Sequence, residues 1–253
     1  MKFNTLLIAF FFSLLNISVY AQMKGKLTYK LTSNDEKMGR REMDKVVFFT
    51  DKGSVEFNVD KRAEDLNQDN DESKGYLVFK NKKTDFIYKN FAKKSLYFRG
   101  LVGKTGYLTA DTLLNFKWKI TKEKSKIANY NCVKATTKFR GRNYVAWYTE
   151  DIALQNGPWK FCGLPGLIIK VADDQNMFSY QLTGIDLKAK FDPKTVAIPS
   201  VYANDKAITY KEYMILYKKK LEAFAKLSKV TTSGKDGSYG TVSITLPAEM
   251  EKF

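Results

Sequence analysis

The sequence predicts a mainly β protein of the α+β class. We expect a single curved antiparallel β-meander or half-barrel, with one long C-terminal amphipathic helix packed on it. Short apolar or alternating segments follow one another at hairpin spacing through most of the chain, and one segment near the C-terminus has helical periodicity instead. With 44% hydrophobic and 28% charged residues, the composition excludes a disordered chain and a multi-span membrane protein.

The N-terminus has the features of a secretory signal peptide. Lys2 precedes an apolar run from Leu6 to Leu15, and Val19-Tyr20-Ala21 places small residues at a cleavage site. The apolar run is too short to span a bilayer. We therefore expect residues 1–21 to be a signal peptide and residues 22–253 to form one β-rich domain. The protein should be exported, to the periplasm or the outer membrane, with an extracellular location left open.

Expected strands follow one another along the mature chain, many of them joined by turns rich in Gly, Asp, Asn or Lys. They lie at 27–31, 46–49, 55–59, 76–79, 86–88, 96–98, 107–108, 116–120, 130–137, 144–148, 167–171, 178–182 and 241–246. Consecutive hairpins of this kind form an antiparallel sheet that normally buries one face.

The helical segment runs from about Thr209 to Leu227. Its apolar residues recur at helical spacing, and Thr209 with Glu212 forms a capping box. Lysines 218–220 lie mostly on the other side. We expect this helix to cover the apolar face of the sheet, because a one-sided meander needs such a cover. A basic amphipathic helix lying on a membrane surface is the alternative.

The chain is basic and has no histidine. It holds 43 Lys and Arg against 27 Asp and Glu, a net charge of +16, and cleavage of the leader leaves +15. Export argues against nucleic acid as a partner. Because lysine dominates, we favour a solvated coat of lysines, with peripheral contact to an anionic membrane surface left open.

No catalytic constellation is evident. The lack of histidine excludes Ser-His-Asp and Cys-His mechanisms and HExxH zinc sites. The neighbouring Glu150 and Asp151 would point to opposite faces of a strand, so they form no acid/base pair. The acidic segment 60–72 begins like a calcium loop but has Asn70 and Tyr76 where Gly and Glu are needed. We expect no enzyme activity, no cofactor and no metal.

The two cysteines, Cys132 and Cys162, are expected to form a disulfide, because two cysteines in an exported chain usually pair.

The most specific stretch is residues 156–168. Gly157-Pro158 and Pro165-Gly166 bracket Trp159 and Phe161, and Leu164-Pro165-Gly166-Leu167 suits a type II turn with positive φ at Gly166. The stretch is either a turn that caps the core or a rigid binding loop. The candidate binding residues are Trp147, Trp159, Phe161, Leu164 and Pro165.

Residues 163–168 spell GLPGLI, and they follow Phe139-Arg140-Gly141-Arg142, Ala146-Trp147-Tyr148-Thr149 and Gly157-Pro158. The sequence resembles the GLPGLI family, also called Porph_ging, of exported proteins from Bacteroidetes-type bacteria. The resemblance implies a cell-envelope location and a role alongside outer-membrane receptor systems. It supplies no catalytic residues.

Two functions follow as hypotheses. The first is a non-catalytic envelope binding or assembly protein that uses the Trp159 loop against a protein partner. The second is a periplasmic carrier of an apolar ligand, such as a lipid or a lipoprotein acyl chain. A carrier would need an apolar cavity between sheet and helix, lined by Tyr213, Met214 and Tyr217. The sequence names neither the ligand nor the oligomeric state.

Overall fold

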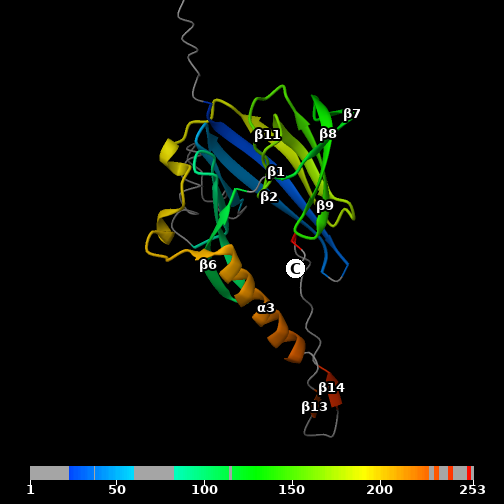
Figure 1. Ribbon diagram of the computed structural model, residues 1–253, viewed down its shortest axis with the longest axis vertical. Coiled ribbons are helices and arrows are strands. Elements are labelled where there is room, and N and C mark those ends of the chain that lie inside the picture. Colours follow the sequence, from blue (N-terminus) through cyan, green and yellow to red (C-terminus); the bar gives the residue numbers. More distant parts are fainter. Residues whose placement is uncertain are drawn as a thin grey trace, which may run out of the picture.

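The computed structural model describes residues 23–36, 38–59, 83–113, 116–227, 231–233, 239–241 and 250–251. The predicted signal peptide, the acidic segment 60–72, the expected strand at 76–79 and most of that at 241–246 lie outside these residues. Within them, a mainly β protein with one C-terminal helix is confirmed (Figure 1).

Twelve strands form one open sheet that curls around the GLPGLI loop, residues 150–166, which joins β9 to β10 (Figure 1). Its order is β12-β6-β5-β4-β3-β2-β1-β11-β10-β9-β8-β7. The strands are β1 (Gly25–Asp35), β2 (Gly39–Thr50), β3 (Gly53–Asn58), β4 (Phe86–Asn90), β5 (Ser95–Val102), β6 (Thr105–Thr112), β7 (Lys119–Ile127), β8 (Tyr130–Phe139), β9 (Arg142–Thr149), β10 (Leu167–Asp173), β11 (Phe178–Asp186) and β12 (Ile208–Thr209). A separate pair, β13 (Thr231–Ser233) and β14 (Tyr239–Thr241), lies near the C-terminus.

Two meanders make up the sheet. One runs from β1 outward to β6, and the other runs from β7 back to β11, which pairs with β1. All these pairs are antiparallel, and the short β12 adds to β6 in parallel. The expected strand at 116–120 is placed too early, because β7 is an edge strand of exposed lysines whose apolar pattern is weak.

Both faces of the sheet centre are buried, contrary to the one-sided burial that the sequence predicts. Alternate residues of β2 show this: Val47 and Phe49 join the core under the GLPGLI loop, which we call the inner face. Val46 and Phe48 join a second core on the outer face, covered by the segment around Phe191. That segment contains the 3-10 turns η1 (Pro193–Thr195) and η2 (Ser200–Tyr202).

The helix α3 (Tyr210–Leu227) forms as predicted, with its capping box. The backbone N–H and hydroxyl of Thr209 donate to Glu212 Oε2 at 2.7 and 2.9 Å, and the Glu212 N–H donates back to Thr209 Oγ1. These reciprocal bonds satisfy groups that a helix start leaves unpaired.

The helix packs on the sheet through its first turns only, so the prediction that it covers the apolar face is wrong. None of its described side chains is buried, Ile215 is 58% exposed, and Tyr213, Tyr217 and Leu221 are half-buried. The first turns touch β5, where Tyr213 packs edge-on against Phe98, and the helix then runs away from the sheet (Figure 1). The GLPGLI loop already fills the inner face, so little apolar surface is left for α3. No helix among the described residues is long and apolar enough to cross a bilayer.

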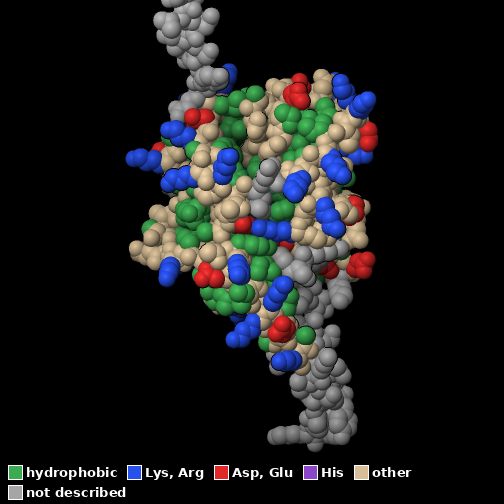
Figure 2. Space-filling model, viewed as in Figure 1, with side chains coloured by type: hydrophobic (Ala, Val, Ile, Leu, Met, Phe, Trp, Pro, Cys, Tyr) green, Lys and Arg blue, Asp and Glu red, His purple; other side chains and the backbone are tan. Residues whose placement is uncertain are grey.

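Lys and Arg side chains are spread over the face seen in Figure 2 and do not gather in one patch. This distribution fits a solvated coat on that face.

Candidate ligand-binding site

The GLPGLI loop turns its aromatic residues into the inner core. Trp159 is 9% exposed, and Phe161 and Leu164 are fully buried. The Phe161 ring packs against Tyr144, Trp159 and Phe116 with centroids 4.9, 5.0 and 5.3 Å apart. The loop therefore packs as part of the core and does not project as an exposed recognition loop.

A buried lysine holds this loop in place. Lys89 on β4 is 1% exposed, and its ammonium donates to Asn156 Oδ1, Gly157 O and Phe161 O at 2.8, 2.8 and 2.9 Å. Burial lowers the pKa of Lys89 to about 8. All three ammonium donors have partners, so this lysine acts as a structural clamp.

The glycine roles in the motif differ from those predicted. Gly166 does not have positive φ, so the type II turn is wrong, and Gly163 adopts φ +87° instead. Gly166 is required for a different reason: a Cβ there would lie 1.9 Å from the carbonyl oxygen of Thr149, because the loop returns tightly against the end of β9.

These two positions should respond differently to alanine. We expect Gly166→Ala to cost more than ~3 kcal/mol of unfolding free energy, because backbone must move. Gly163→Ala meets no atom within 4 Å, so its cost should be about 1–2 kcal/mol, from backbone strain alone. Urea unfolding of both variants measures the difference, and equal losses would contradict this assignment.

The predicted disulfide is wrong, because the structure does not join Cys132 to Cys162, and both side chains are buried. The Cys132 thiol lies against the Tyr130 carbonyl on β8 and near Asp151, whereas Cys162 lies near Lys89. Burial raises the pKa of both thiols, which disfavours the reactive thiolate.

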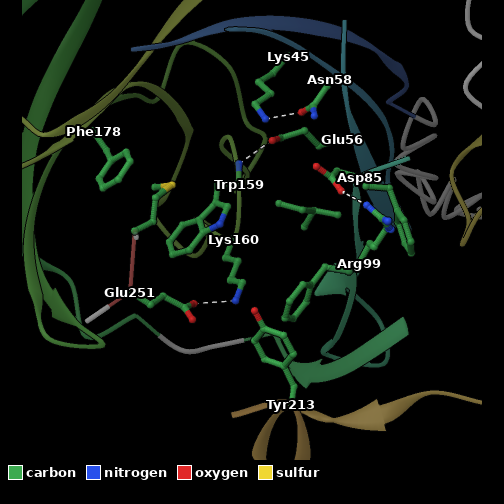
Figure 3. Close-up of a pocket in the computed structure, with 14 residues that line it drawn as sticks. Lys45, Glu56, Asn58, Asp85, Arg99, Trp159, Lys160, Phe178, Tyr213 and Glu251 are labelled. Carbon is green, nitrogen blue, oxygen red and sulfur yellow. Dashed lines mark hydrogen bonds and ion pairs between the residues drawn. The ribbon is translucent and has the colours of Figure 1, made fainter. Parts of the chain in front are cut away.

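A cavity of about 280 Å³ opens beside the loop on the inner face, and we call it the inner pocket (Figure 3). Trp159 and the rings of Phe98 and Tyr213 form part of its wall. Its lining also includes six charged side chains, namely Lys45, Glu56, Asp85, Arg99, Lys160 and Glu251. Arg99 Nη1 and Asp85 Oδ1 form an ion pair at 2.8 Å.

Glu56 is the most enclosed acid of the inner pocket. It lies on β3, is 3% exposed, and accepts the backbone N–H of Trp159 through Oε2 at 2.6 Å. Burial raises its pKa, and the neighbouring Lys45 and Lys89 oppose that shift. Lys45 donates to Asn58, and burial lowers its pKa. An acid and a base shifted in opposite directions beside a cavity are typical of a functional site.

Lys160 and Glu251 form the opposite wall. Lys160 is 4% exposed, and its Nζ donates to Glu251 Oε1 at 2.7 Å (Figure 3). The same ammonium lies 4.2 Å from the Phe98 ring centroid and about 5 Å from those of Tyr210 and Trp159. Rings that surround a cation in this way stabilise it where water is excluded.

Of the five candidate binding residues, Trp159 alone lines the inner pocket. Phe161 and Leu164 lie in the core, Pro165 is exposed, and Trp147 is half-buried on β9. Sequence reasoning missed Glu56 and Lys160. The available signal was a charge flanked by apolar neighbours, Val55-Glu56-Phe57 and Trp159-Lys160-Phe161.

Residues 138–170 match the model of the family described as "Protein of unknown function (Porph_ging)". In this segment the chain resembles the Porph_ging family. The Porph_ging segment spans the β8–β9 turn, β9 and the whole GLPGLI loop, so it includes Arg140, Trp159 and Lys160. Comparison with curated proteins finds no match.

Two solved structures of PNGF-II are similar to this chain in fold. They align with TM-scores of 0.53 and 0.52 at 16% identity, over 78% and 79% of this chain. The chain spans about a third of the length of those proteins, 34% and 33%. A LolA superfamily protein from Nitrosomonas europaea aligns over 71% of this chain and 92% of its own, at 8% identity and a TM-score of 0.32. That score is too low to support an argument.

Proposed function

We propose that this protein is an exported, non-catalytic binding protein that holds a small polar ligand in the inner pocket. The observation that carries the proposal is the lining of this cavity by three acids, three bases and aromatic rings. The signal peptide that the sequence predicts at residues 1–21 supports a periplasmic or outer-membrane location. The family resemblance supports action alongside outer-membrane receptor systems.

The charges of the pocket favour a polar ligand over an acyl chain. Arg99 is paired with Asp85 and Lys160 with Glu251, so the lining is nearly neutral but densely polar. An acyl chain would displace water from these charged groups without forming hydrogen bonds to them. Such desolvation has an unfavourable free energy, so it would weaken binding. Met214 and Tyr217, expected in an apolar cavity, are not among the lining residues.

The size of the pocket favours a small ligand. Its volume of about 280 Å³ is just below the usual range for small-molecule sites, about 300–1,000 Å³. A single amino acid, a dipeptide or one sugar is of the right size. Trp159 and Phe98 contribute aromatic surface to the lining, and the charged groups contribute donors and acceptors at fixed positions.

Binding without catalysis is supported by the state of the reactive groups. Both thiols are buried with raised pKa values, and the low-pKa Lys89 already donates to three acceptors. The pKa shift of Glu56 suits hydrogen bonding to a ligand, and its Oε2 already accepts from the loop backbone.

The test is a melting-temperature screen of the mature chain against amino acids, dipeptides, monosaccharides and fatty acids. Binding to the native state raises the melting temperature. We expect stabilisation by one polar class, and its loss in the Glu56→Gln variant. The matched control is Glu222→Gln, which changes an exposed acid on α3 and should behave as wild type.

A further inference from the structure

Three donors from separate parts of the chain converge on one carboxylate at the wall of the inner pocket. Glu251 Oε1 accepts from Lys160 Nζ at 2.7 Å and from Arg140 Nη1 at 2.8 Å. Its Oε2 accepts the hydroxyl of Tyr210 at 2.7 Å. The donors come from the GLPGLI loop, the β8–β9 turn and the first residue of α3.

These donors are positioned by contacts that do not involve Glu251. Arg140 stands in a two-residue hairpin turn in which it and Gly141 have φ of +42° and +76°, as in type I′ turns. Its Nη2 bonds Asp111 Oδ2 at 2.7 Å, and its guanidinium lies 3.5 Å from the Tyr210 ring centroid. Lys160 is held over the Phe98 ring. The arrangement is therefore preorganised to bind a carboxylate.

The site requires an anion. Without Glu251, two cations, Lys160 and Arg140, would share one acid, Asp111, in a largely buried setting, where an unpaired charge is costly. Burial lowers the pKa of Lys160, and Glu251 counteracts that shift.

The bound carboxylate belongs to the third residue from the end of the chain. The adjacent Met250 is held by the hydroxyls of Tyr144, which donates to its carbonyl, and Tyr180, which lies 3.5 Å from its sulfur. Met250 and Glu251 both line the inner pocket, and Glu251 points across it toward Lys160 (Figure 3). Met250 and Glu251 thus occupy the site in the manner of a ligand.

We propose that Lys160, Arg140 and Tyr210 form a carboxylate-binding site, that Glu251 fills it in the free protein, and that a ligand carboxylate displaces Glu251. This inference rests on the proposed function and narrows its ligand to a small carboxylate, such as an acidic amino acid or a peptide C-terminus. Ligand binding then releases Met250 and Glu251 from the pocket.

The test uses the full mature chain and a peptide of its own residues 247–253, amidated at the C-terminus and fluorescently labelled. Three proteins are compared by anisotropy: wild type, Glu251→Gln and the control Glu222→Gln. In wild type the tethered Glu251 competes at high effective concentration. We expect the peptide to bind Glu251→Gln at least ~10-fold more tightly than the other two proteins. A peptide with Gln at position 251 should bind at least ~10-fold more weakly than the Glu peptide.

Equal affinity of the three proteins, or equal binding of the Glu and Gln peptides, would overturn the proposal. A second measurement needs no variant: carboxypeptidase digestion of wild type, followed by mass spectrometry. Succinate should speed removal of Glu251 and Met250 several-fold, whereas the neutral succinamide should not, and equal rates would count against displacement.

The outcomes also separate this inference from the proposed function. If a ligand without a carboxylate stabilises the wild type and the peptide binds all three proteins equally, the proposed function is supported and the carboxylate-binding site is contradicted. If the peptide binds Glu251→Gln and no polar compound stabilises the wild type, the carboxylate-binding site is supported and the proposed function is contradicted.

Discussion

Replacing Lys89 with methionine should lower the free energy of unfolding by about 3–5 kcal/mol. Methionine fills a similar volume but leaves Asn156 Oδ1, Gly157 O and Phe161 O without their donor. Each buried acceptor left unpaired costs about 1–3 kcal/mol, which relaxation or an entering water partly relieves. Urea denaturation followed by tryptophan fluorescence measures the loss.

The matched control is Lys93→Met in the exposed β4–β5 turn, which should change stability by less than ~0.5 kcal/mol. A loss below ~1 kcal/mol for Lys89→Met would show that the GLPGLI loop does not depend on this clamp.

Replacing Trp159 with alanine should cost ~3–5 kcal/mol, the usual range for removing a large aromatic side chain from a core. Its ring packs against Phe161, Phe139 and Tyr144 with centroids 5.0, 6.0 and 6.4 Å apart. We therefore expect the variant to lose stability before any binding function can be tested. Trp147→Ala on β9, where the ring is half-buried, is the control and should cost clearly less.

The backbone at Trp159 adds a sharper comparison. Its φ is +51°, a region that glycine adopts without strain. Trp159→Gly should therefore be about 1 kcal/mol more stable than Trp159→Ala. An unchanged melting temperature in Trp159→Ala, with a lost partner, would restore the exposed binding loop that the sequence left open.

Local features of the fold were predictable because they depend on neighbouring residues. Alternation and turn chemistry marked most strands, and the capping box of Thr209 and Glu212 marked the start of α3. The pairing of β1 with β11 was not predictable, because it joins segments about 150 residues apart. The position of α3 was missed for a related reason: the sequence does not show that the GLPGLI loop already covers the inner face.

The site was mostly hidden because its charges resemble surface residues in sequence. Lysine is normally exposed, so Lys45, Lys89 and Lys160 were counted in the lysine coat. The burial of Lys89 and Lys160 depends on partners far along the chain, Phe161 for Lys89 and Glu251 for Lys160. Trp159 was found as a candidate because the turn residues around it are its neighbours in sequence. Its packing in the core depends on residues from other strands, which the local sequence does not reveal.

The central claim is that the charged inner pocket binds a small polar ligand. The most direct test is the melting-temperature shift of the wild type and Glu56→Gln with polar and fatty-acid compounds. The claim predicts a rise with a polar compound in the wild type and in Glu222→Gln, and none in Glu56→Gln. Stabilisation by fatty acids alone, or an equal rise in all three proteins, would contradict it.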